Sequence, residues 1–355
     1  MLLEGRISVA VVGTGEIATK ARIPAYLANR HVDLVGLVDV DKKKAEKTAR
    51  KLNIGNVFES IDELYEKQDV DAVSICTPPH THADLAIKAL SHGSHVLCEK
   101  PMANDVEKGI RMVRASKASQ RILMVSSYRR FVNAFRRAKD RIQKGALGHV
   151  YCIEDVQLTP SPLLEWGKSP WYYSPEGGGV LSDLGTHSFD LMNYLYDGFP
   201  RAISSQGLAH LDSPVEESCV SVLEYPGNRI AVGILSWLSS TNIENVAIHG
   251  TVGTLYVSPK FLLDINRIDI PEISLWREAS LNLLRQKFRR LPMLNPYQIV
   301  DPIQLETDRF ITRIRQNQAF HQSALNGLNV LVTIVAAKKA MKENRKVRIT
   351  PITEA

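Results

Sequence analysis

The feature that most constrains the fold is an apolar run that leads directly into a glycine-rich turn. Residues Ile7 to Val12 are almost all apolar, which is typical of a strand covered on both faces of its sheet. The pattern G-x-G-x-x-A follows at residues 13–18, before a segment with helical spacing. Glycine turns are common for steric reasons, but a strand before and a helix after are the context of a dinucleotide-binding turn.

Three positions of this turn each meet a separate physical requirement. Gly13 permits the tight turn, Gly15 lets the backbone approach a pyrophosphate, and Ala18 keeps the helix close to the strand. Amide groups at the start of the helix would then face the phosphates. The residues expected to bind the cofactor here are Gly13, Thr14, Gly15, Glu16 and Ile17.

An acidic residue follows where the adenosine ribose would lie. A second apolar run, Leu34 to Val38, ends in Asp39. Its carboxylate can accept hydrogen bonds from both ribose hydroxyls and repels a 2′-phosphate, so NAD is favoured over NADP. Lys42, Lys43 and Lys44 leave NADP open, since a nearby cation offsets that repulsion, although these lysines also suit a solvated helix face.

Strand and helix alternate up to about residue 125, which predicts an α/β domain with a doubly wound parallel sheet. We assign residues 1–126 to this Rossmann domain. Its predicted strands are Ile7–Val12, Leu34–Val38, Val57–Phe58, Ala72–Cys76, His95–Cys98 and Ile122–Val125. Helical spacing covers Lys42–Leu52, Ile61–Lys67, His82–Ser91 and Val106–Ser119.

Two strand exits carry polar residues. Thr77, Pro78 and His82 follow the fourth strand, and Glu99 and Lys100 follow the fifth. Either segment alone is typical of an ordinary proline-rich exit from a strand. Ligands of a parallel sheet, however, bind beyond the carboxyl ends of its strands. We therefore expect these residues to lie on the cofactor side of the sheet.

The second half, residues 127–355, has a different pattern. After a basic helix at Ala134–Lys144, closely spaced strands separated by turn signals predict an α+β domain with a large, mainly antiparallel sheet. We also expect helices at Gly179–Tyr196 and Gln322–Glu343. The predicted strands are Val150–Leu158, Ala202–Leu208, Cys219–Tyr225, Ile230–Trp237, Ile243–His249 and Thr254–Val257.

A glycine run precedes the most distinctive group of titratable residues in this half. If residues from Gly179 onward are helical, Asp183, His187 and Asp190 share one face of the helix. A histidine beside a carboxylate is suited to proton transfer near neutral pH. A surface helix with incidental polar residues is the simpler alternative, and a metal site is another, but no third ligand is fixed. We predict no metal.

Composition narrows the classes of partner. Lys and Arg exceed Asp and Glu by 44 − 38 = 6 among 355 residues, which is too mild an excess for a nucleic-acid-binding surface. The start has no secretory signal pattern, and the longest apolar stretch, around Asn329 to Ala337, is shorter than the roughly 20 residues that span a bilayer. We expect a soluble cytoplasmic protein without an integral membrane segment. Its four cysteines are far apart, so we predict reduced thiols, mostly buried.

The motifs together resemble the Gfo/Idh/MocA family, named for glucose–fructose oxidoreductase and inositol dehydrogenase. The resemblance covers nearly the whole chain. It rests on the glycine turn at 13–18, on Glu99-Lys100-Pro101, on the connector segments 128–131 and 145–148, and on the run from Gly177 to His187.

The resemblance implies a set of roles. Lys100 corresponds to the active-site lysine, Asp183 to the aspartate that contacts substrate, and His187 to the acid/base histidine. Thr77, Pro78, His82 and Glu99 would line the nicotinamide side, with Lys100. Tyr128, Arg129 and Trp171 are expected to contact substrate with the three catalytic residues, although core packing is an equal alternative for Trp171 and its aromatic neighbours Trp166, Tyr172 and Tyr173.

Three functions stay open under this resemblance. The first is a dehydrogenase that moves a hydride between NAD(P) and a hydroxyl-bearing carbon of a sugar, polyol or nucleotide sugar. The second is a glycosidase that oxidises and re-reduces its substrate with no net redox change. The third, a non-catalytic sensor of the cofactor, is the weakest because it has no need of an acid/base group. The resemblance also implies a homo-oligomer, a dimer or tetramer, formed through the open face of the second sheet.

The segment from about Lys260 to Pro302 matches no motif of the family. Within it, residues 277–291 have the spacing of a basic amphipathic helix. Such a helix could bind the diphosphate of a nucleotide sugar or an anionic membrane surface, or could simply present a solvated basic face.

Overall fold

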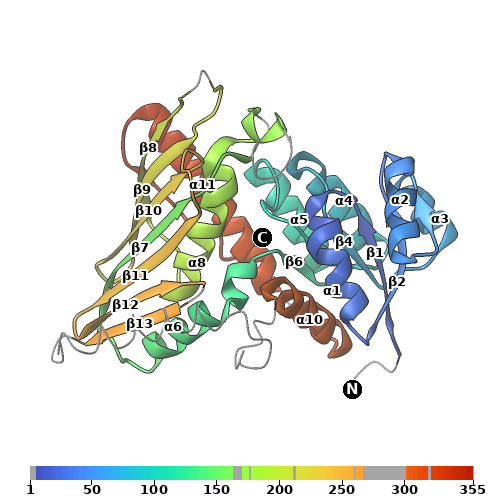
Figure 1. Ribbon diagram of the computed structural model, residues 1–355, viewed down its shortest axis with the longest axis horizontal. Helices are drawn as coiled ribbons and strands as arrows, with labels where there is room; N and C mark the ends of the chain where they lie inside the picture. Colours follow the sequence, from blue (N-terminus) through green and yellow to red (C-terminus); the bar gives the residue numbers. More distant parts are fainter. Residues whose placement is uncertain are drawn as a thin grey trace.

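The computed structural model describes residues 5–162, 170–175, 177–210, 213–259, 261–266, 301–318 and 321–354. For residues 170–171, 261–266 and 321–322 it describes the backbone alone. The chain forms two sheets with helices packed between and around them, and helix α11 (His321–Glu343) runs from the second sheet to the first (Figure 1). The expectation for residues 277–291 lies outside the described residues.

The first sheet is parallel, as predicted, with the strand order β3-β2-β1-β4-β5-β6. Its order reverses beside β1, so the glycine turn after β1 opens at the switch point where ligands of such sheets bind. The strands are β1 (Ile7–Val12), β2 (Val32–Val38), β3 (Val57–Phe58), β4 (Ala72–Ile75), β5 (His95–Cys98) and β6 (Leu123–Val125). Each predicted strand of this domain is confirmed to within two residues at its ends.

The helices between these strands begin at side-chain caps in three cases. Asp41, Ser60 and Asp105 accept hydrogen bonds from backbone amides of the first turn that follows each. After the glycine turn, a short π-helical segment η1 leads into the first α-helix. These elements are η1 (Ala18–Arg22), α1 (Ile23–Ala28), α2 (Lys42–Leu52), α3 (Ile61–Lys67), α4 (Pro79–Ser91) and α5 (Val106–Ser119).

Both faces of the first sheet are covered. Strand β1 sends Val9 and Val11 toward α1 on one face, and Ala10 and Val12 toward α3, α4 and α5 on the other. All four side chains are buried, as the apolar run predicted. Two helices from the C-terminal part of the chain complete these layers, because α10 (Pro302–Arg315) packs on the first face and α11 on the second.

The second sheet is mixed and mainly antiparallel, in the order β13-β12-β11-β7-β10-β9-β8-β14, with β7 and β10 parallel. One face packs on η4 (Leu181–Gly185), α8 (Thr186–Tyr196) and α11, where Leu184, Phe189 and Ile334 respectively meet buried strand residues. The elements are η2 (Tyr128–Phe131), α6 (Asn133–Gln143), β7 (Val150–Leu158), η3 (Pro170–Tyr173), η4 (Leu181–Gly185), α8 (Thr186–Tyr196), β8 (Ala202–Leu208), β9 (Ser218–Tyr225), β10 (Arg229–Ser236), β11 (Ile243–Gly250), β12 (Gly253–Ser258), β13 (Phe261–Asn266) and β14 (Val347–Arg348).

The other face of this sheet carries exposed apolar side chains. Val220 and Val222 on β9 stand beside Ile230 and Ile234 on β10, and each is more than a third exposed. No described helix covers this face, whereas α8 and α11 cover the opposite one (Figure 1). An exposed apolar face of this kind is typical of a protein contact.

Helix α11 differs from expectation in one respect. Its residues Ser323–Glu343 are long and apolar enough to cross a membrane by length and composition, a property that the shorter stretch around Asn329 to Ala337 did not predict. Within the fold, 61% of an 18-residue apolar stretch of this helix is buried. Gly327 lies so close to β6 that an added Cβ would meet Val125 at 2.7 Å. These contacts are those of a core helix that joins the two sheets.

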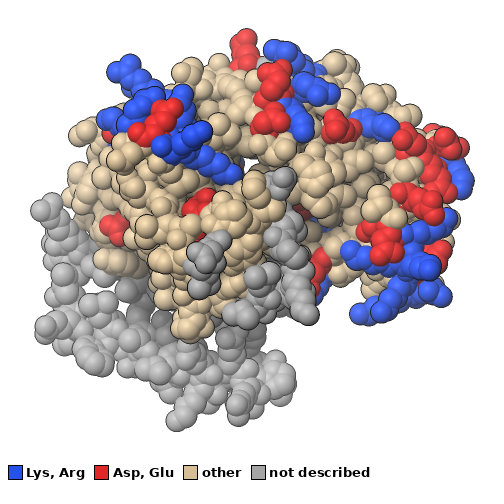
Figure 2. Space-filling model, turned by 90° about the horizontal axis from the view of Figure 1, so that it is seen from above, with Lys and Arg blue, Asp and Glu red and all other residues tan. Residues whose placement is uncertain are grey.

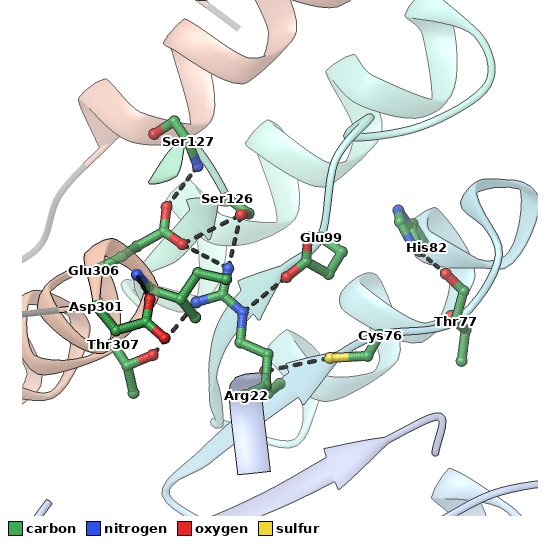
Figure 3. Close-up of polar contacts among 12 residues, drawn as sticks. Arg22, Cys76, Thr77, His82, Glu99, Ser126, Ser127, Asp301, Glu306 and Thr307 are labelled. Atoms are coloured by element: carbon green, nitrogen blue, oxygen red, sulfur yellow. Dashed lines mark hydrogen bonds and ion pairs between the residues drawn. The ribbon is translucent and has the colours of Figure 1, made fainter. Parts of the chain in front are cut away.

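A buried ion network fixes α10 to the first sheet (Figure 3). The Arg22 guanidinium at the end of η1 donates to Glu99 at 2.7 Å, to Ser126 at 2.7 Å and to Glu306 of α10 at 2.5 Å. Arg22 is 1% exposed and Glu306 is fully buried. Burial raises the pKa of Glu306, and the attraction of Arg22 opposes that rise. Three distant segments therefore share one charge cluster beside the glycine turn.

The network predicts a large loss of stability when its cation is removed. Arg22→Met leaves Glu99 and Glu306 buried without their partner, which costs about 3–5 kcal/mol of the free energy of unfolding. Urea unfolding measures this value. Lys20→Met is the matched control, because Lys20 lies on the same segment with a largely exposed ion pair to Glu16, worth about 1 kcal/mol or less. Equal stabilities of the two variants would contradict the prediction.

Candidate functional site

The glycine turn has the geometry of a cofactor cradle. Gly13 has φ +91°, and an added Cβ would stand 2.8 Å from the carbonyl oxygen of Cys76, so no larger residue fits. A Cβ at Gly15 would find only that carbonyl, at 4.0 Å, and the turn faces an open cleft there. Ala18 is fully buried against the sheet. The turn thus leaves room for a ligand at the position that the motif assigns to a pyrophosphate.

Asp39 is held against this turn at the end of β2. Its carboxylate accepts hydrogen bonds from the Thr14 amide at 2.7 Å and hydroxyl at 2.6 Å, and from the Asp41 amide at 3.0 Å. Partial burial alone would raise the pKa of Asp39, but these hydrogen bonds and nearby Lys44 hold the pKa below its usual value. The carboxylate is therefore charged at neutral pH and fixed at the edge of the cleft.

A cleft of about 1480 Å³ runs from this turn to the second sheet; we call it the interdomain cleft. Most of the predicted site residues line it. They are Gly13, Thr14, Gly15, Glu16, Ile17, Asp39, Thr77, Pro78, Glu99, Lys100, Tyr128, Asp183 and His187. Residues that are far apart in the sequence thus meet in one cavity that holds the cofactor cradle.

Lys100 and Asp183 form an ion pair across this cleft. The Lys100 ammonium, after β5, donates to the Asp183 carboxylate of η4 and lies 3.4 Å from the Asp183 carbonyl oxygen. Both side chains are 17% exposed, which leaves them open to a ligand. The pair joins the loop after β5 to η4 of the second domain, and it places a cation in the lining of the cleft.

His187 lies one helical turn beyond Asp183. The ring of Tyr128 stands edge-on to it, with centroids 4.9 Å apart, and no described residue hydrogen-bonds to the imidazole. Burial, then Lys100 and Arg129, hold the pKa of His187 well below its usual value. The imidazole is therefore neutral at pH 7, the form that accepts a proton.

Two predicted residues lie elsewhere. His82 is fully buried behind the cleft wall, where its ring nitrogens lie 2.9 Å from the Pro101 carbonyl and 2.8 Å from the Thr77 carbonyl. We expected His82 to line the nicotinamide side of the cleft, but it instead links the loops after β4 and β5 to each other. Arg129 is 1% exposed, because its guanidinium is held by both oxygens of Asp155 and by Glu244.

The expected alignment of Asp183, His187 and Asp190 is only partly correct. The segment Leu181–Gly185, which carries Asp183, is a π-helical turn and is wider than an α-helical one, whereas His187 and Asp190 lie on the α-helix α8 that follows. The Asp190 carboxylate accepts hydrogen bonds from Nε and Nη2 of Arg130, each at 2.7 Å, and lies outside the interdomain cleft. The side chain of Trp171 is outside the described residues.

Several residues of the cleft were not predicted. Glu244 and Asn242 from the start of β11, Gln157 from β7 and Trp237 after β10 line the side opposite the glycine turn. Burial raises the pKa of the Glu244 carboxyl, with Arg129 opposing the rise. No local motif marks these residues, because the pairing of distant strands brings them to the cleft.

The four cysteines are free thiols. Cys76, Cys98 and Cys219 are free and buried, as predicted, and Cys152 is partly exposed. Burial raises the pKa of the Cys76 thiol to about 12. Within the described residues, no group of three His, Cys, Asp or Glu side chains is arranged to hold a metal ion.

Comparison with known proteins extends this picture. Residues 7–127 match the model of an oxidoreductase family with an NAD-binding Rossmann fold, named for glucose–fructose oxidoreductase, inositol dehydrogenase and MocA. Residues 135–256 match the model of the C-terminal domain of the same family.

Individual relatives cover most of the chain. The D-glucoside 3-dehydrogenase of Escherichia coli is 25% identical over 76% of this chain and 74% of its own. The myo-inositol 2-dehydrogenase of Thermotoga maritima is 22% identical over 97% and 99%. The WlbA dehydrogenase of Bordetella pertussis, solved with NADH and UDP-GlcNAcA, has the same fold, with a TM-score of 0.83, 20% identity and 99% of each chain covered.

The two family matches agree with the two sheets, the glycine turn and the cleft between them. The chain therefore belongs to the Gfo/Idh/MocA family of NAD-binding oxidoreductases.

Proposed function

We propose that the protein is an NAD-dependent dehydrogenase that oxidises a hydroxyl-bearing carbon of a sugar, polyol or nucleotide sugar, or reduces the matching carbonyl. One observation carries the proposal: the Lys100–Asp183 ion pair and neutral His187 share a cleft with the glycine turn. A cation and a proton acceptor at the same place are what the oxidation of an alcohol needs.

Each residue has a chemical part in this reaction. Bound NAD supplies the hydride acceptor. His187, as a neutral imidazole, accepts the hydroxyl proton of the substrate. The Lys100 ammonium stabilises the negative charge that develops on the same oxygen, and Asp183 keeps that ammonium in position through its carboxylate. In the reverse direction, His187 returns the proton to the alkoxide oxygen.

The lining of the cleft supports a polyhydroxylated substrate. Glu244, Gln157 and Asn242 supply hydrogen-bonding groups opposite the cofactor cradle, and the Tyr172 ring, which packs edge-on to the buried Trp237, borders the same cleft. Aromatic faces suit the apolar faces of sugar rings. The named substrates of the relatives, D-glucosides, myo-inositol and UDP-GlcNAcA, belong to the same chemical class.

The charge near the ribose position supports NAD. Asp39 is held in its charged form by Thr14 and Asp41, so it repels a 2′-phosphate. Of the three lysines that kept NADP open, Lys44 lines the cleft, whereas Lys42 pairs with Glu59 at 3.4 Å. Figure 2 shows acidic and basic side chains interspersed on the upper face of the molecule, which favours a small-molecule substrate over nucleic acid.

The open apolar face of the second sheet supports a homo-oligomer. We expect a second copy of the chain to cover Val220, Val222, Ile230 and Ile234. Light scattering of Ile234→Lys should show a smaller species than the unchanged protein, because a buried charge opposes the contact. The matched control is Leu27→Lys, which places the same charge at an exposed apolar residue of α1, away from this sheet. Equal mass of all three proteins would contradict this assembly.

The proposed roles predict the effect of removing each group on turnover. His187→Ala removes the proton acceptor and should lower kcat by about 10²–10⁴-fold. Lys100→Met removes the charge that stabilises the alkoxide and should lower kcat by about 10²–10³-fold. NAD reduction is followed with a panel of free sugars, glycosides, polyols, sugar acids and UDP-sugars, with product analysis.

Two controls accompany these variants. NADH binding should be unchanged in both, since neither residue forms the glycine turn. His210→Ala, an exposed histidine outside the cleft, should keep full turnover. Near-normal turnover of His187→Ala and Lys100→Met would contradict the roles, and glycoside cleavage without NADH formation would contradict the dehydrogenase.

The electrostatics predict a low pKa for His187. The pKa measured by NMR should lie below 6.5, because burial and the cations Lys100 and Arg129 disfavour the imidazolium. Lys100→Met removes one of these cations and should raise that pKa, while Lys108→Met on α5 should not change it. A pKa at or above 6.5 in the unchanged protein would contradict a neutral base at pH 7.

A further inference from the structure

The face of the second sheet that packs on α8 ends in a polar patch at the interdomain cleft. Along β7, Ile153, Asp155 and Gln157 are buried on this face, and the side chains change from apolar to polar toward the cleft. On β11, Glu244 shares the face with the buried Val246 and is paired directly with Gln157. Side chains of directly paired residues lie next to each other. Glu244 and Gln157 therefore form one patch, and both line the cleft.

A buried network fixes the orientation of Gln157. The Asp155 carboxylate is fully buried and accepts hydrogen bonds from both terminal nitrogens of Arg129, at 2.6 Å and 3.1 Å, and from the side-chain nitrogen of Gln157 at 3.0 Å. Only the NH₂ group of an amide donates to a carboxylate. The contact therefore directs the carbonyl oxygen of Gln157, which is a hydrogen-bond acceptor, away from Asp155.

The charge of Glu244 is only partly compensated. Its Oε1 lies 2.9 Å from Nε of Arg129, but the same guanidinium already binds both oxygens of Asp155. Two carboxylates thus share one cation. Burial raises the pKa of the Glu244 carboxyl, Arg129 opposes the rise, and the charge of Asp155 adds to it. The Glu244 side chain is 33% exposed, so the surplus of negative charge faces the cleft.

The described lining on this side of the cleft adds no positive charge. Among the described residues from 150 onward that line the cleft, the acidic ones are Asp183 and Glu244, and none is Lys or Arg. Lys100, which the first domain contributes, is paired with Asp183. In the part of the chain that the structure describes, the substrate side of the cleft is therefore acidic.

Tyr128 connects Glu244 to the predicted proton acceptor. Burial, and next the charge of Glu244, raise the pKa of the Tyr128 hydroxyl. The ring of the same tyrosine stands edge-on to His187, with centroids 4.9 Å apart. A substrate whose hydroxyl reaches His187 therefore lies within the electrostatic influence of Glu244.

We propose that Glu244 is a substrate-specificity residue, which accepts hydrogen bonds from the hydroxyl groups of a neutral sugar or polyol and disfavours a substrate with a carboxylate on its ring. This inference rests on the proposed function, because it names the substrate class of that reaction. A hydroxyl group that donates to a carboxylate forms a charge-assisted hydrogen bond. A substrate carboxylate would instead bring a third negative charge to one guanidinium, in a partly buried site where like charges repel strongly.

Calorimetric titration of the full chain with saturating NADH tests the proposal. The probes are two pairs of compounds that differ only at C6, which is CH₂OH in one member and a carboxylate in the other. They are methyl β-D-glucoside with methyl β-D-glucuronide, and UDP-glucose with UDP-glucuronate. We expect the neutral member of at least one pair to bind at least tenfold more tightly than its uronate. Glu244→Gln keeps the size of the side chain and removes its charge, so it should reduce that ratio at least fivefold.

Two variants separate charge from packing. Glu244→Asp retains the carboxylate and should keep the preference for the neutral compound. Glu107→Gln makes the same substitution at an exposed residue of α5, outside the cleft, and should leave the ratio unchanged. NADH affinity and urea unfolding verify that all variants are folded.

The outcomes distinguish this proposal from the proposed reaction. A preference in binding that Glu244→Gln removes, without NADH formation in turnover, would support the role of Glu244 and contradict the dehydrogenase. Equal or tighter binding of the uronates, an unchanged ratio in Glu244→Gln, or the absence of saturable binding of all four compounds would overturn the role of Glu244.

Discussion

A parallel sheet has to be covered on both faces, and in this protein the rest of the architecture depends on how that is done. Its own connecting helices cover only part of the sheet. The remaining area is covered by α10 and α11, which follow the second domain in the chain. The C-terminal part of the chain thus completes the layers of the first sheet. The Arg22–Glu99–Glu306 network fixes α10 against that sheet.

The packing of α10 and α11 on the first sheet sets the geometry of the cleft. Glu99 and Lys100 are consecutive residues at the end of β5, so the network that holds Glu99 also places the loop that carries Lys100. Helix α11 packs on β6 at Gly327 and on η4 and α8, the segment that carries Asp183 and His187. The ion pair between Lys100 and Asp183 therefore joins two parts of the chain whose relative position is already fixed by packing. In the proposed reaction, that arrangement places the cation and the neutral imidazole on one substrate oxygen.

Much of this arrangement was predictable from local patterns. The apolar run at Ile7–Val12, the glycine turn and the charged end of the second strand follow rules of neighbouring residues, and the structure confirms the strands, the turn and Asp39 beside it. Helix α10 and the edge strand β14 were not predicted. The family resemblance, and not spacing alone, indicated that Lys100, Asp183 and His187 would meet.

What could not be predicted depends on contacts between distant segments. Arg22 gave no sign of its role, because its partners are 77 and 284 residues away. Glu244 and Gln157 reach the cleft through strand pairing, and Asp190 lies outside the cleft, bound by Arg130, which is 60 residues away in the sequence. Histidine is a residue type that often binds ligands, but both ring nitrogens of His82 lie at hydrogen-bond distance from backbone carbonyl oxygens.

Isotope transfer distinguishes net hydride transfer to NAD from a closed redox cycle. A substrate from the sugar, polyol or UDP-sugar classes is deuterated at the carbon that bears the reacting hydroxyl, and the cofactor and product are analysed by mass spectrometry after turnover with NAD. If the protein is a dehydrogenase, each NADH formed carries one deuterium, and a matching amount of ketone or aldehyde is produced. Cleavage of a glycosidic bond, with deuterium retained in the product and no NADH accumulating, would contradict a dehydrogenase.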